Sequence, residues 1–454
     1  MQLTRLGDVA HINPRFDKSS LADDVPVSFV QMASVGASDG KINVSIVRPF
    51  AEVKKGSYTP FKDGDVLFAK VTPCMENGKM AIARGLMSGV GFGSSEFHVL
   101  RPSDQVDANY LYYFVSSQAF RKEAAGHMTG AVGLRRVPAA FLADAQLPMV
   151  PLDEQRRIVA EIETQFSRLD EAVANLHRVK ANLKRFKASV LKAAVEGRLV
   201  ETEASIAQRE GRSYETGEQL LQRILEERRA KWTGRGKYKP PVQAPTDGHD
   251  VLPEGWTTAT ADQLAHLITS GSRGWGDFYS DTGVLFIRAQ DIKTDTLNLH
   301  NAARVDVPID AEGTRSSVSE GDILVTITGA NVTKSALVPE MDELAFVSQH
   351  VALMKLTQPE TAPFVFNWII SPANGRKTLE SWAYGAGKPG LSLEQVRTLP
   401  IALPPLAEQI RVVAEIDRHL SIIRKVEAEV DTDFKRAQSL RQSVLSKVFL
   451  GSAA

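Results

Sequence analysis

The chain has 454 residues, 43% of them apolar and 24% charged, and its 54 basic residues balance 54 acidic ones. These values are close to globular averages and argue against a disordered chain, while the length predicts two or more domains. Zero net charge means that nucleic acid could be bound only through local patches or with a partner. No apolar run is long enough for a bilayer and no secretion signal is visible, so we expect a cytoplasmic protein that does not contact membranes.

Residues 1–150 are predicted to form a first domain of mixed strands and helices. The run DVLFAKV at 65–71 predicts a strand, and residues 108–126 predict a helix. The domain also contains two polar loops with glycines, at 69–82 and 126–137. Their Asn, Lys and Arg side chains suit base edges and phosphates, although ordinary exposed hairpins carry the same residues.

Residues 151–200 are predicted to form one long helix between Pro151 and Gly197. Its apolar residues recur at helical spacing: Ile158, Ile162, Phe166, Leu169, Val173, Leu176, Leu183, Phe186 and Val190. At a rise of about 1.5 Å per residue the helix is a long rod, and its single apolar face needs a partner. Residues 177–192 carry six basic residues and no acidic one, which fits a solvated face, a phosphate backbone or an acidic partner.

Residues 201–251 are predicted to be a connector with a short charged helix at 218–232 and a tether rich in Pro and Gly. After it, the chain repeats itself. PLDEQRRIVAEI at Pro151 returns as PLAEQIRVVAEI at Pro405, and the two copies run without a gap to Gly197 and Gly451 at an offset of 254 residues. The second copy fills the apolar stripe with Val412, Ile416, Leu420, Ile423 and Val430.

The regions in front of the two helices correspond as well. GDVAHI matches DQLAHL, DGDVLFAKV matches EGDILVTIT, SEFHVL matches SQHVAL, and TGAVGLRRV matches GAGKPGLSL. Residues 252–404 are therefore predicted to be a second copy of the first domain, and residues 405–454 a second long helix. The predicted fold class is α+β: two homologous α/β domains are separated by two long helices, which pair as an antiparallel coiled coil with pseudo-twofold symmetry.

The residues predict no catalytic or metal centre. Cys74 is the single cysteine, the nine histidines lack the spacing of a zinc site, and no phosphate loop or nucleophile elbow is present. NPRF at 13–16 resembles the Asn-Pro-Pro-Phe motif of amino-methyltransferases. No glycine-rich cofactor turn precedes it, so we interpret it as a turn.

Taken in order, the repeated blocks resemble one family, the specificity subunits of Type I restriction-modification enzymes. The blocks are the two PLxEQxRxVAEI openings, SVLKAAVEGRLV at 189–200, LLQRILEERRAKW at 220–232, YKPPV at 238–242 and LPEGW at 252–256. The resemblance covers the whole chain. It implies two target-recognition domains, residues 1–150 and 252–404, each of which reads one half of a bipartite, asymmetric DNA site. It also implies that the long helices act as a ruler between them.

The resemblance further implies that the chain is not itself an enzyme. Its partners would be double-stranded DNA, two methyltransferase subunits for adenine N6 methylation, and restriction subunits. S-adenosylmethionine, ATP and magnesium would be bound by those partners, so no cofactor is expected on this chain. Two alternatives remain open: a structural coiled-coil adaptor that reads no bases, and an autonomous DNA methyltransferase or nuclease.

Two sets of site residues follow. We expect DNA contacts from residues in or beside the loops of both domains: Gln31, Lys70, Asn77, Lys79, Arg135, Arg136, Arg273, Trp275, Arg288, Gln290, Asn331, Lys334 and Lys388. We expect the openings of the two long helices to dock the methyltransferase subunits through Glu154, Gln155, Arg157, Glu408, Gln409 and Arg411.

Overall fold

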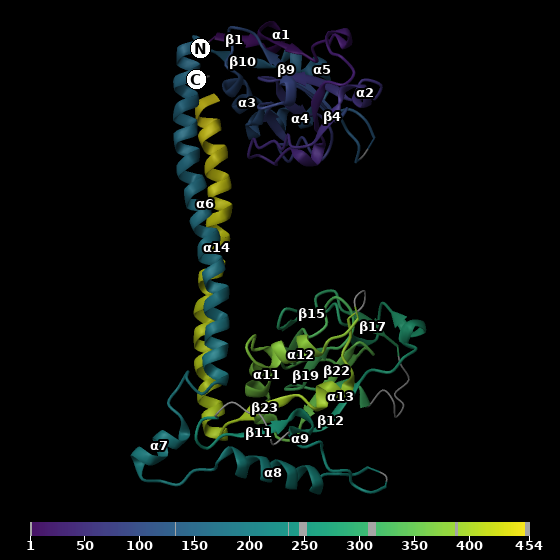
Figure 1. Cartoon of the computed structure of the whole chain (residues 1–454), viewed down its shortest axis with the longest axis vertical. Coiled ribbons are helices and arrows are strands. Elements are labelled where there is room, and N and C mark those ends of the chain that lie inside the picture. The colour runs from purple at the N-terminus through teal and green to yellow at the C-terminus, as the bar shows by residue number, and fades with distance from the viewer. Residues whose placement is uncertain are drawn as a thin grey trace. The chain divides into compact units, whose positions relative to one another are not determined.

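The computed structural model describes residues 2–131, 133–234, 236–244, 252–306, 315–385 and 389–449. The chain divides into two compact units, one formed by Met1–Arg178 with Glu429–Ala454 and the other by Val179–Ala428. Each unit contains one mixed domain and a stretch of each long helix (Figure 1). We call the domains the first head (residues 2–150) and the second head (residues 252–404).

The first head contains two four-stranded sheets and a two-stranded ribbon. The sheet β2-β9-β6-β7 is antiparallel, whereas β3 and β8 run parallel in the sheet β4-β3-β8-β5. Its elements are β1 (Gln2–Arg5), α1 (Leu6–Val9), β2 (Ala10–Ile12), β3 (Pro26–Val30), β4 (Val47–Pro49), α2 (Phe50–Val53), β5 (Thr59–Lys62), β6 (Val66–Ala69), β7 (Met80–Ile82), β8 (Val90–Gly93), β9 (Phe97–Pro102), α3 (Ala108–Ser116), α4 (Gln118–Gly126), α5 (Ala139–Asp144) and β10 (Gln146–Met149).

Strand β6 is buried on both faces. Successive side chains of a strand point to opposite faces of its sheet. Val66 and Phe68 pack with the helices of the head, whereas Leu67 and Ala69 pack with residues such as Phe61 of the other sheet. A continuous apolar run, without a polar face, is what a strand buried on both sides requires.

The second head repeats this arrangement. Its antiparallel sheet has the order β12-β22-β19-β20, and β14 and β21 run parallel in the sheet β13-β17-β14-β21-β18. Its elements are β11 (Thr257–Thr260), α9 (Ala261–Leu264), β12 (Ala265–Ser270), β13 (Tyr279–Ser280), β14 (Val284–Ile287), β15 (Ile292–Lys293), β16 (Thr296–Leu297), β17 (Ala303–Val305), β18 (Ser317–Val318), β19 (Ile323–Thr326), β20 (Ser335–Leu337), β21 (Ala345–Val347), β22 (Val351–Leu356), α11 (Ala362–Ile370), α12 (Gly375–Trp382), α13 (Leu393–Arg397) and β23 (Pro400–Leu403).

The repeat predicted from the sequence is confirmed at the level of strand pairing. Val66 of β6 faces Leu100 of β9, and the corresponding Ile323 of β19 faces Met354 of β22. The pairing corrects the match of SEFHVL with SQHVAL by one residue, because that match aligned Leu100 with Leu353. Ile323 and Val325 pack into one core and Leu324 into another, as the corresponding residues of β6 do. The predicted α+β class with two copies of one domain is therefore correct.

The predicted helix at 108–126 is broken into two, and the corresponding segment 362–382 of the second head is broken in the same way. Ser117 separates α3 from α4, because it takes an extended conformation and its hydroxyl accepts a hydrogen bond from the Phe120 amide (3.3 Å). Ser371 ends α11, since it precedes Pro372 and a residue before proline disfavours the helical conformation.

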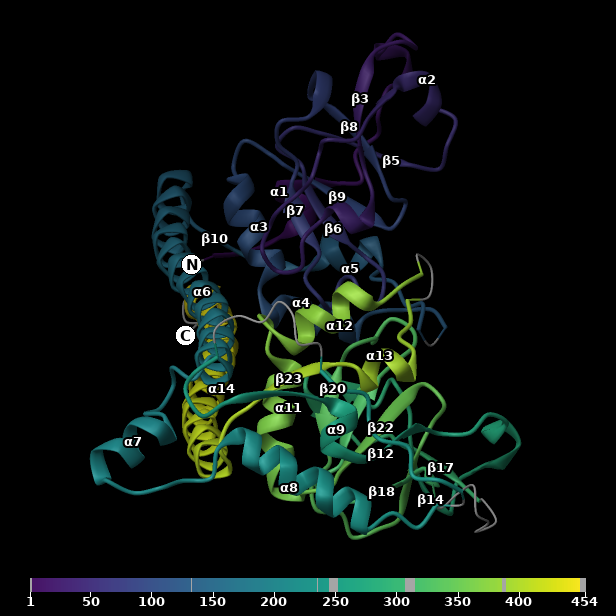
Figure 2. The same ribbon diagram turned by 60° about the horizontal axis from the view of Figure 1, so that its bottom comes forward.

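The connector contains two helices rather than the one that was predicted. The expected short helix is α8 (Gly217–Ala230), which is capped by Thr216 and packs on α9 and β11 (Figure 2). The second is α7 (Glu203–Glu210), which begins after Thr202. None of the helices in the described ranges is long and apolar enough to span a membrane.

The two long helices are α6 (Leu152–Val195) and α14 (Leu406–Phe449), each of 44 residues. In the first unit, Phe166 of α6 lies 4.7 Å from the Arg441 guanidinium of α14, and the His177 ring lies 4.7 Å from that of Phe434. In the second unit the Phe186 ring lies 5.6 Å from that of His419. Residues later in α6 contact residues earlier in α14, as expected for two helices that pair antiparallel.

The residues of this apolar stripe are buried to different degrees. Ile162, Val412 and Ile416 are fully buried, whereas Phe186 is 45% exposed. A single partner helix covers only part of a wide stripe, so residues at its margin keep contact with water. Gly197 ends α6 in the left-handed conformation (φ 67°), as predicted, and the corresponding Gly451 lies outside the described residues.

Candidate functional site

Each head presents a polar loop directly after its central strand. The first hairpin loop (residues 70–79) connects β6 to β7, and the second hairpin loop (residues 327–334) connects β19 to β20. Both loops are tied to a later segment of their head in the same way. The amide of Val137 donates to the carbonyl of Lys70, and the amide of Leu391 donates to the carbonyl of Ile327, each at 2.8 Å. In each head, the segment that ends at Val137 or at Leu391 therefore lies beside the hairpin loop. The predicted match of 129–137 with 385–393 is two residues out of register at this end, because it aligned Val137 with Leu393.

Two cations of the first head hold backbone carbonyls. Lys79 Nζ donates to the carbonyls of Met32 (3.0 Å) and Val35 (3.1 Å). Arg135 donates to the carbonyl of Met128 (2.9 Å) and to the end of α4. These side chains fix the path of the polar loops around them.

Arg136 forms a bidentate pair with Glu96, with N···O distances of 2.7 and 2.9 Å. The hydrogen bond from Arg136 lowers the pKa of Glu96 and outweighs the effect of burial. Lys70 lies half-buried nearby and also favours the ionised form of Glu96. Glu96 was not among the predicted site residues, because it lies within the repeated block SEFHVL and has no distinguishing neighbour there.

Two predicted residues of the first head have exposed side chains, Gln31 and Asn77. Within the described ranges neither side chain has a hydrogen-bond partner, while the backbone at Asn77 is held by the Ser38 hydroxyl (3.0 Å). An amide side chain on a fixed backbone can offer both a donor and an acceptor to a base edge.

The predicted residues of the second head also differ in exposure. Arg273 is exposed, and in the described part of the chain it has no ion-pair partner. Trp275 is 8% exposed, and its ring stacks on Phe286 at a centroid distance of 5.0 Å. The prediction that Trp275 contacts DNA is therefore corrected, because its ring is part of the core. Lys388 lies outside the described residues.

Four predicted residues of the second head come together. Arg288 pairs with Asp291 (3.0 Å), and the Gln290 side-chain amide lies 3.1 Å from the Arg288 guanidinium, which its oxygen accepts from when it faces that group. Asn331 donates to the carbonyl of Ala289 (3.0 Å) and accepts from Lys334 (2.8 Å). This network joins the second hairpin loop to the segment after β14. Asp291 was missed, although its spacing of three residues from Arg288 was visible in the sequence.

The expected docking residues are only partly at the surface. Gln155 is fully buried and makes three side-chain hydrogen bonds of 2.9 Å, to Gln105, Asp107 and Val150. Gln409 is 1% exposed, and its Nε2 donates to Pro404 (2.9 Å). Its Oε1 is buried and has no hydrogen-bond partner among the described residues.

Glu408 is also buried and accepts from the Glu203 amide (2.8 Å) and the Trp256 indole (3.0 Å). Burial raises the pKa of Glu408. The docking prediction is thus wrong for Gln155, Glu408 and Gln409, since all three attach the start of a long helix to the chain's own backbone or indole.

The other three docking residues are more accessible. Glu154 and Arg157 form an exposed pair on the first turns of α6 (2.9 Å). Arg411 is about one-third exposed and pairs with the buried Glu203 (2.6 Å). Burial would raise the pKa of Glu203, but the hydrogen bonds from Arg212 and Arg411 outweigh it and lower the pKa.

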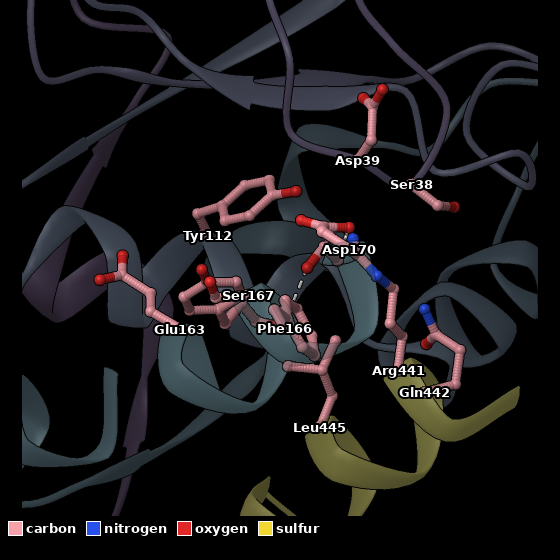
Figure 3. A pocket seen from close by; sticks show the side chains of 12 residues that line it. Ser38, Asp39, Tyr112, Glu163, Phe166, Ser167, Asp170, Arg441, Gln442 and Leu445 are labelled. Carbon is pink, nitrogen blue, oxygen red and sulfur yellow. Dashed lines mark hydrogen bonds and ion pairs between the residues drawn. The ribbon is translucent and has the colours of Figure 1, made fainter. Parts of the chain in front are cut away.

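A cavity of about 280 Å³ lies in the first unit where the first head meets the long helices. Figure 3 shows Arg441 of α14 and Asp170 of α6 pointing toward one another, and the two form an ion pair. Tyr112 and the Ser38–Asp39 loop lie opposite them. Burial raises the pKa of Tyr112, and it raises that of the neighbouring Tyr113 to about 12. The cavity is therefore lined by neutral phenols and by one ion pair that joins the two long helices.

The turn interpretation of NPRF agrees with the geometry at Asn13. This residue takes a positive φ of 51°, and its side chain faces His98 Nδ1 (2.9 Å) and accepts from the Val99 amide (3.0 Å). Its side chain and its backbone amide therefore attach this bend to β9. In the described ranges, no three His, Cys, Asp or Glu residues are grouped so that they could hold a metal ion.

Comparisons with known proteins agree with one another. Residues 1–185 match the family model of the Type I restriction modification DNA specificity domain. The specificity subunit of the Type I restriction enzyme EcoAI from Escherichia coli is 26% identical over 94% of this chain and 79% of its own length. The EcoEI specificity subunit from the same species is 25% identical over 97% of this chain and 80% of its own length.

Two solved structures share the fold. One is a chain from a study of complex assembly and conformational transition of the type I R-M system, with a TM-score of 0.65 and 20% identity over 99% of this chain and 97% of its own. The other is the HsdS subunit from Thermoanaerobacter tengcongensis, with a TM-score of 0.53 and 18% identity over 99% of this chain and 96% of its own.

Gln155 should stabilise the joint between the first head and α6. We expect Gln155→Ala to lower the free energy of unfolding by about 1–3 kcal/mol, because it leaves buried backbone groups without partners. Glu154→Ala is the matched control and should change it by less than about 0.5 kcal/mol, since that side chain is 37% exposed and pairs only with the exposed Arg157. Urea denaturation of the two variants measures the difference; equal effects would contradict the structural role of Gln155.

His98 should make the first head less stable in acid. Its ring is 6% exposed, and Nε2 donates to the Val137 carbonyl (2.9 Å). Burial lowers the pKa of His98 below its usual 6.5; nearby Lys70 lowers it further and Glu96 partly opposes this. The unfolded chain thus takes up this proton first, so the contribution is complete above pH 6.5 and is lost as the pH falls toward the folded pKa.

We expect His98→Gln to flatten this pH dependence while leaving that of the rest of the chain in place. Thermal unfolding midpoints of the two proteins, measured between about pH 7.5 and 5.5, provide the test. Two curves that fall in parallel would show that His98 carries no such linkage.

Proposed function

Because the chain belongs to the family of Type I restriction enzyme specificity subunits, we propose that it reads the DNA sequence for a Type I restriction-modification complex. The observation that carries the proposal is the repeated head. Both heads have a four-stranded antiparallel sheet with the same strand order and the same hydrogen bond between their two loops, but their hairpin loops carry different side chains. A constant frame with variable loops suits two different half-sites.

Each head reads one half of a bipartite, asymmetric site in this proposal. The accessible amides Gln31 and Asn77 serve the first half, and Arg273 and Gln290 serve the second. Such groups recognise base edges in the major groove, and cations beside them hold phosphates. The neutral net charge of the chain indicates that partner subunits supply much of the remaining phosphate contact.

The partners in the proposal are double-stranded DNA, two methyltransferase subunits and restriction subunits. The methyltransferase subunits dock near the accessible pair of Glu154 and Arg157 and near Arg411, and they bring S-adenosylmethionine for adenine N6 methylation. The restriction subunits bring ATP and magnesium. The complex acts in the cytoplasm, and this chain contributes recognition without catalysis.

The direct test is a map of methylated adenines in host cells that carry or lack this chain, with the methyltransferase subunit present in both. We expect methylation at one two-part sequence only when the chain is present. Methylation that does not depend on the chain would overturn the proposal. Methylation by the purified chain alone would instead establish the autonomous enzyme.

Arg273 offers a test of base reading within the second head. We expect Arg273→Ala to weaken binding of the complex to its site by about 1–3 kcal/mol and to relax the preference at one position of one half-site. Arg304→Ala is the control in the same head, because it removes an exposed pair with Glu343 (2.8 Å) away from the hairpin loop. Gel shifts at fixed salt measure both; equal losses on specific and random DNA would argue against base reading by Arg273.

The ruler hypothesis predicts that longer helices lengthen the gap between the half-sites. Seven residues inserted into α6 after Leu176 and seven into α14 after Val430 keep the heptad and add about 10.5 Å. This length equals about three base-pair steps, so the methylated site should gain that spacer. Methylation mapping reads the gap directly, and an unchanged gap would rule out the ruler.

A further inference from the structure

An arginine at the start of the second short helix reaches a hairpin in each head. In the first head, Arg121 of α4 donates from Nε to the carbonyl of Ser116 (3.1 Å) and from its guanidinium to the carbonyl of Glu76. Glu76 stands at the tip of the first hairpin loop, next to the exposed Asn77. Arg121 therefore fixes the backbone from which Asn77 projects.

The same tip is held from a second side. The amide of Ser38 donates to the carbonyl of Gly78 (2.9 Å), and its hydroxyl donates to that of Asn77. Gly78 has a φ of +68°, and a Cβ there would meet both Ser38 and Arg121. The tip is thus enclosed between these two side chains while the Asn77 amide remains exposed.

In the second head, Arg376 of α12 forms an ion pair with Asp295. Each side chain is 12% exposed, and the Nε atom of Arg376 is buried without a hydrogen-bond partner among the described residues. A buried guanidinium in this state depends on its one carboxylate, because removal of that partner would leave an uncompensated charge.

Asp295 connects Arg376 to the loop network described above. It lies in the turn between β15 and β16 with a φ of 62°, and these two strands lie against β20 of the second hairpin. Ile292 of β15 packs in one core with Ala336 of β20. The segment before β15 contains Ala289, whose carbonyl accepts from Asn331. Arg376 thus anchors the side of the network that carries Arg288 and Gln290 and that binds Asn331 of the hairpin loop.

Both helices that carry these arginines share a core with the long helices of their unit. Phe120 of α4 packs in one cluster with Leu445 and Phe449 of α14, and the amide of Gln118 donates to Gln442 of α14 (2.8 Å). Leu379 of α12 packs in one cluster with Ile416 of α14. Each arginine therefore links a loop to a helix that is itself fixed.

We propose that Arg121 and Arg376 are positioning residues that determine half-site specificity, the first for the half read by the first head and the second for the half read by the second. This inference rests on the proposed function. Neither arginine reads a base itself. Arg121 holds the backbone of the first hairpin loop, and Arg376 holds the β15–β16 turn that lies against the second hairpin. Displacement of a contact by about 1 Å is enough to lose much of its energy.

The experiment selects DNA from a pool in which both half-sites are randomised. Complexes of the methyltransferase subunit with full-length variants of the chain are incubated with the pool, and the bound DNA is sequenced. We expect Arg376→Met and Asp295→Asn to reduce enrichment of the second half-site at least about fivefold, the lower range of one bidentate base contact, and to leave the first unchanged. Arg121→Met should do the reverse.

Asp295→Asn and two further variants separate positioning from general stability. Asp295→Asn keeps a residue that accepts a positive φ, so the turn is retained if Arg376→Met fails to fold. Arg376→Lys keeps the charge opposite Asp295 and should restore most of the enrichment. Arg228→Met is the matched control: Arg228 is 13% exposed and bonds to the carbonyl of Ala265 (2.8 Å). Its loss should lower stability without changing either half-site.

The outcomes are distinguishable. If the wild-type complex enriches no two-part sequence, the proposed function itself is overturned, and the inference with it. If the wild-type complex enriches such a sequence but Arg376→Met and Asp295→Asn either keep the second half-site intact or reduce both halves equally, the positioning role is wrong. A loss confined to the matching half-site, with Arg228→Met unchanged, supports it.

Discussion

The packing of the long helices into the cores of the heads is the interaction on which the rest of the structure depends. A helix of 44 residues with one apolar stripe is not stable alone in water, and one partner helix does not cover the whole stripe. Ile162 and Leu445 lie in the core of the first head, and Val190 and Ile416 lie in that of the second. The head and its stretch of paired helix therefore form one cooperative body in each unit.

Several cations of the two heads bind groups of the chain itself. Lys79 and Arg135 hold backbone carbonyls, and Arg136 and Arg288 are neutralised by carboxylates. Cations used in this way give the loops a fixed shape rather than a positive field. Recognition then falls to the fewer side chains that remain exposed on that shape, which fits a subunit that works together with partners on DNA.

The sequence predicted the repeated domains and the long helices much better than the partners of the site residues. Repetition at a constant offset, proline before each helix and continuous apolar runs at β6 and β19 are physical requirements of the elements themselves, so they remain visible without coordinates. Whether Lys79 faces solvent or two carbonyls depends on a segment more than forty residues away. The same limit applies to Trp275, whose partner Phe286 lies on another strand, and to Gln155, which resembles a surface glutamine until its backbone partners are known.

The two glutamines at the starts of the long helices occupy equivalent positions, but they do not hold their joints equally. The Gln155 side chain has three hydrogen bonds, whereas in the described part of the chain Gln409 has one, and its buried oxygen lacks a donor. An unmet acceptor costs about 1–3 kcal/mol. At the start of α14 the neighbouring Glu408 accepts from the Glu203 amide and the Trp256 indole instead, so the duplicated architecture attaches its two long helices through different side chains.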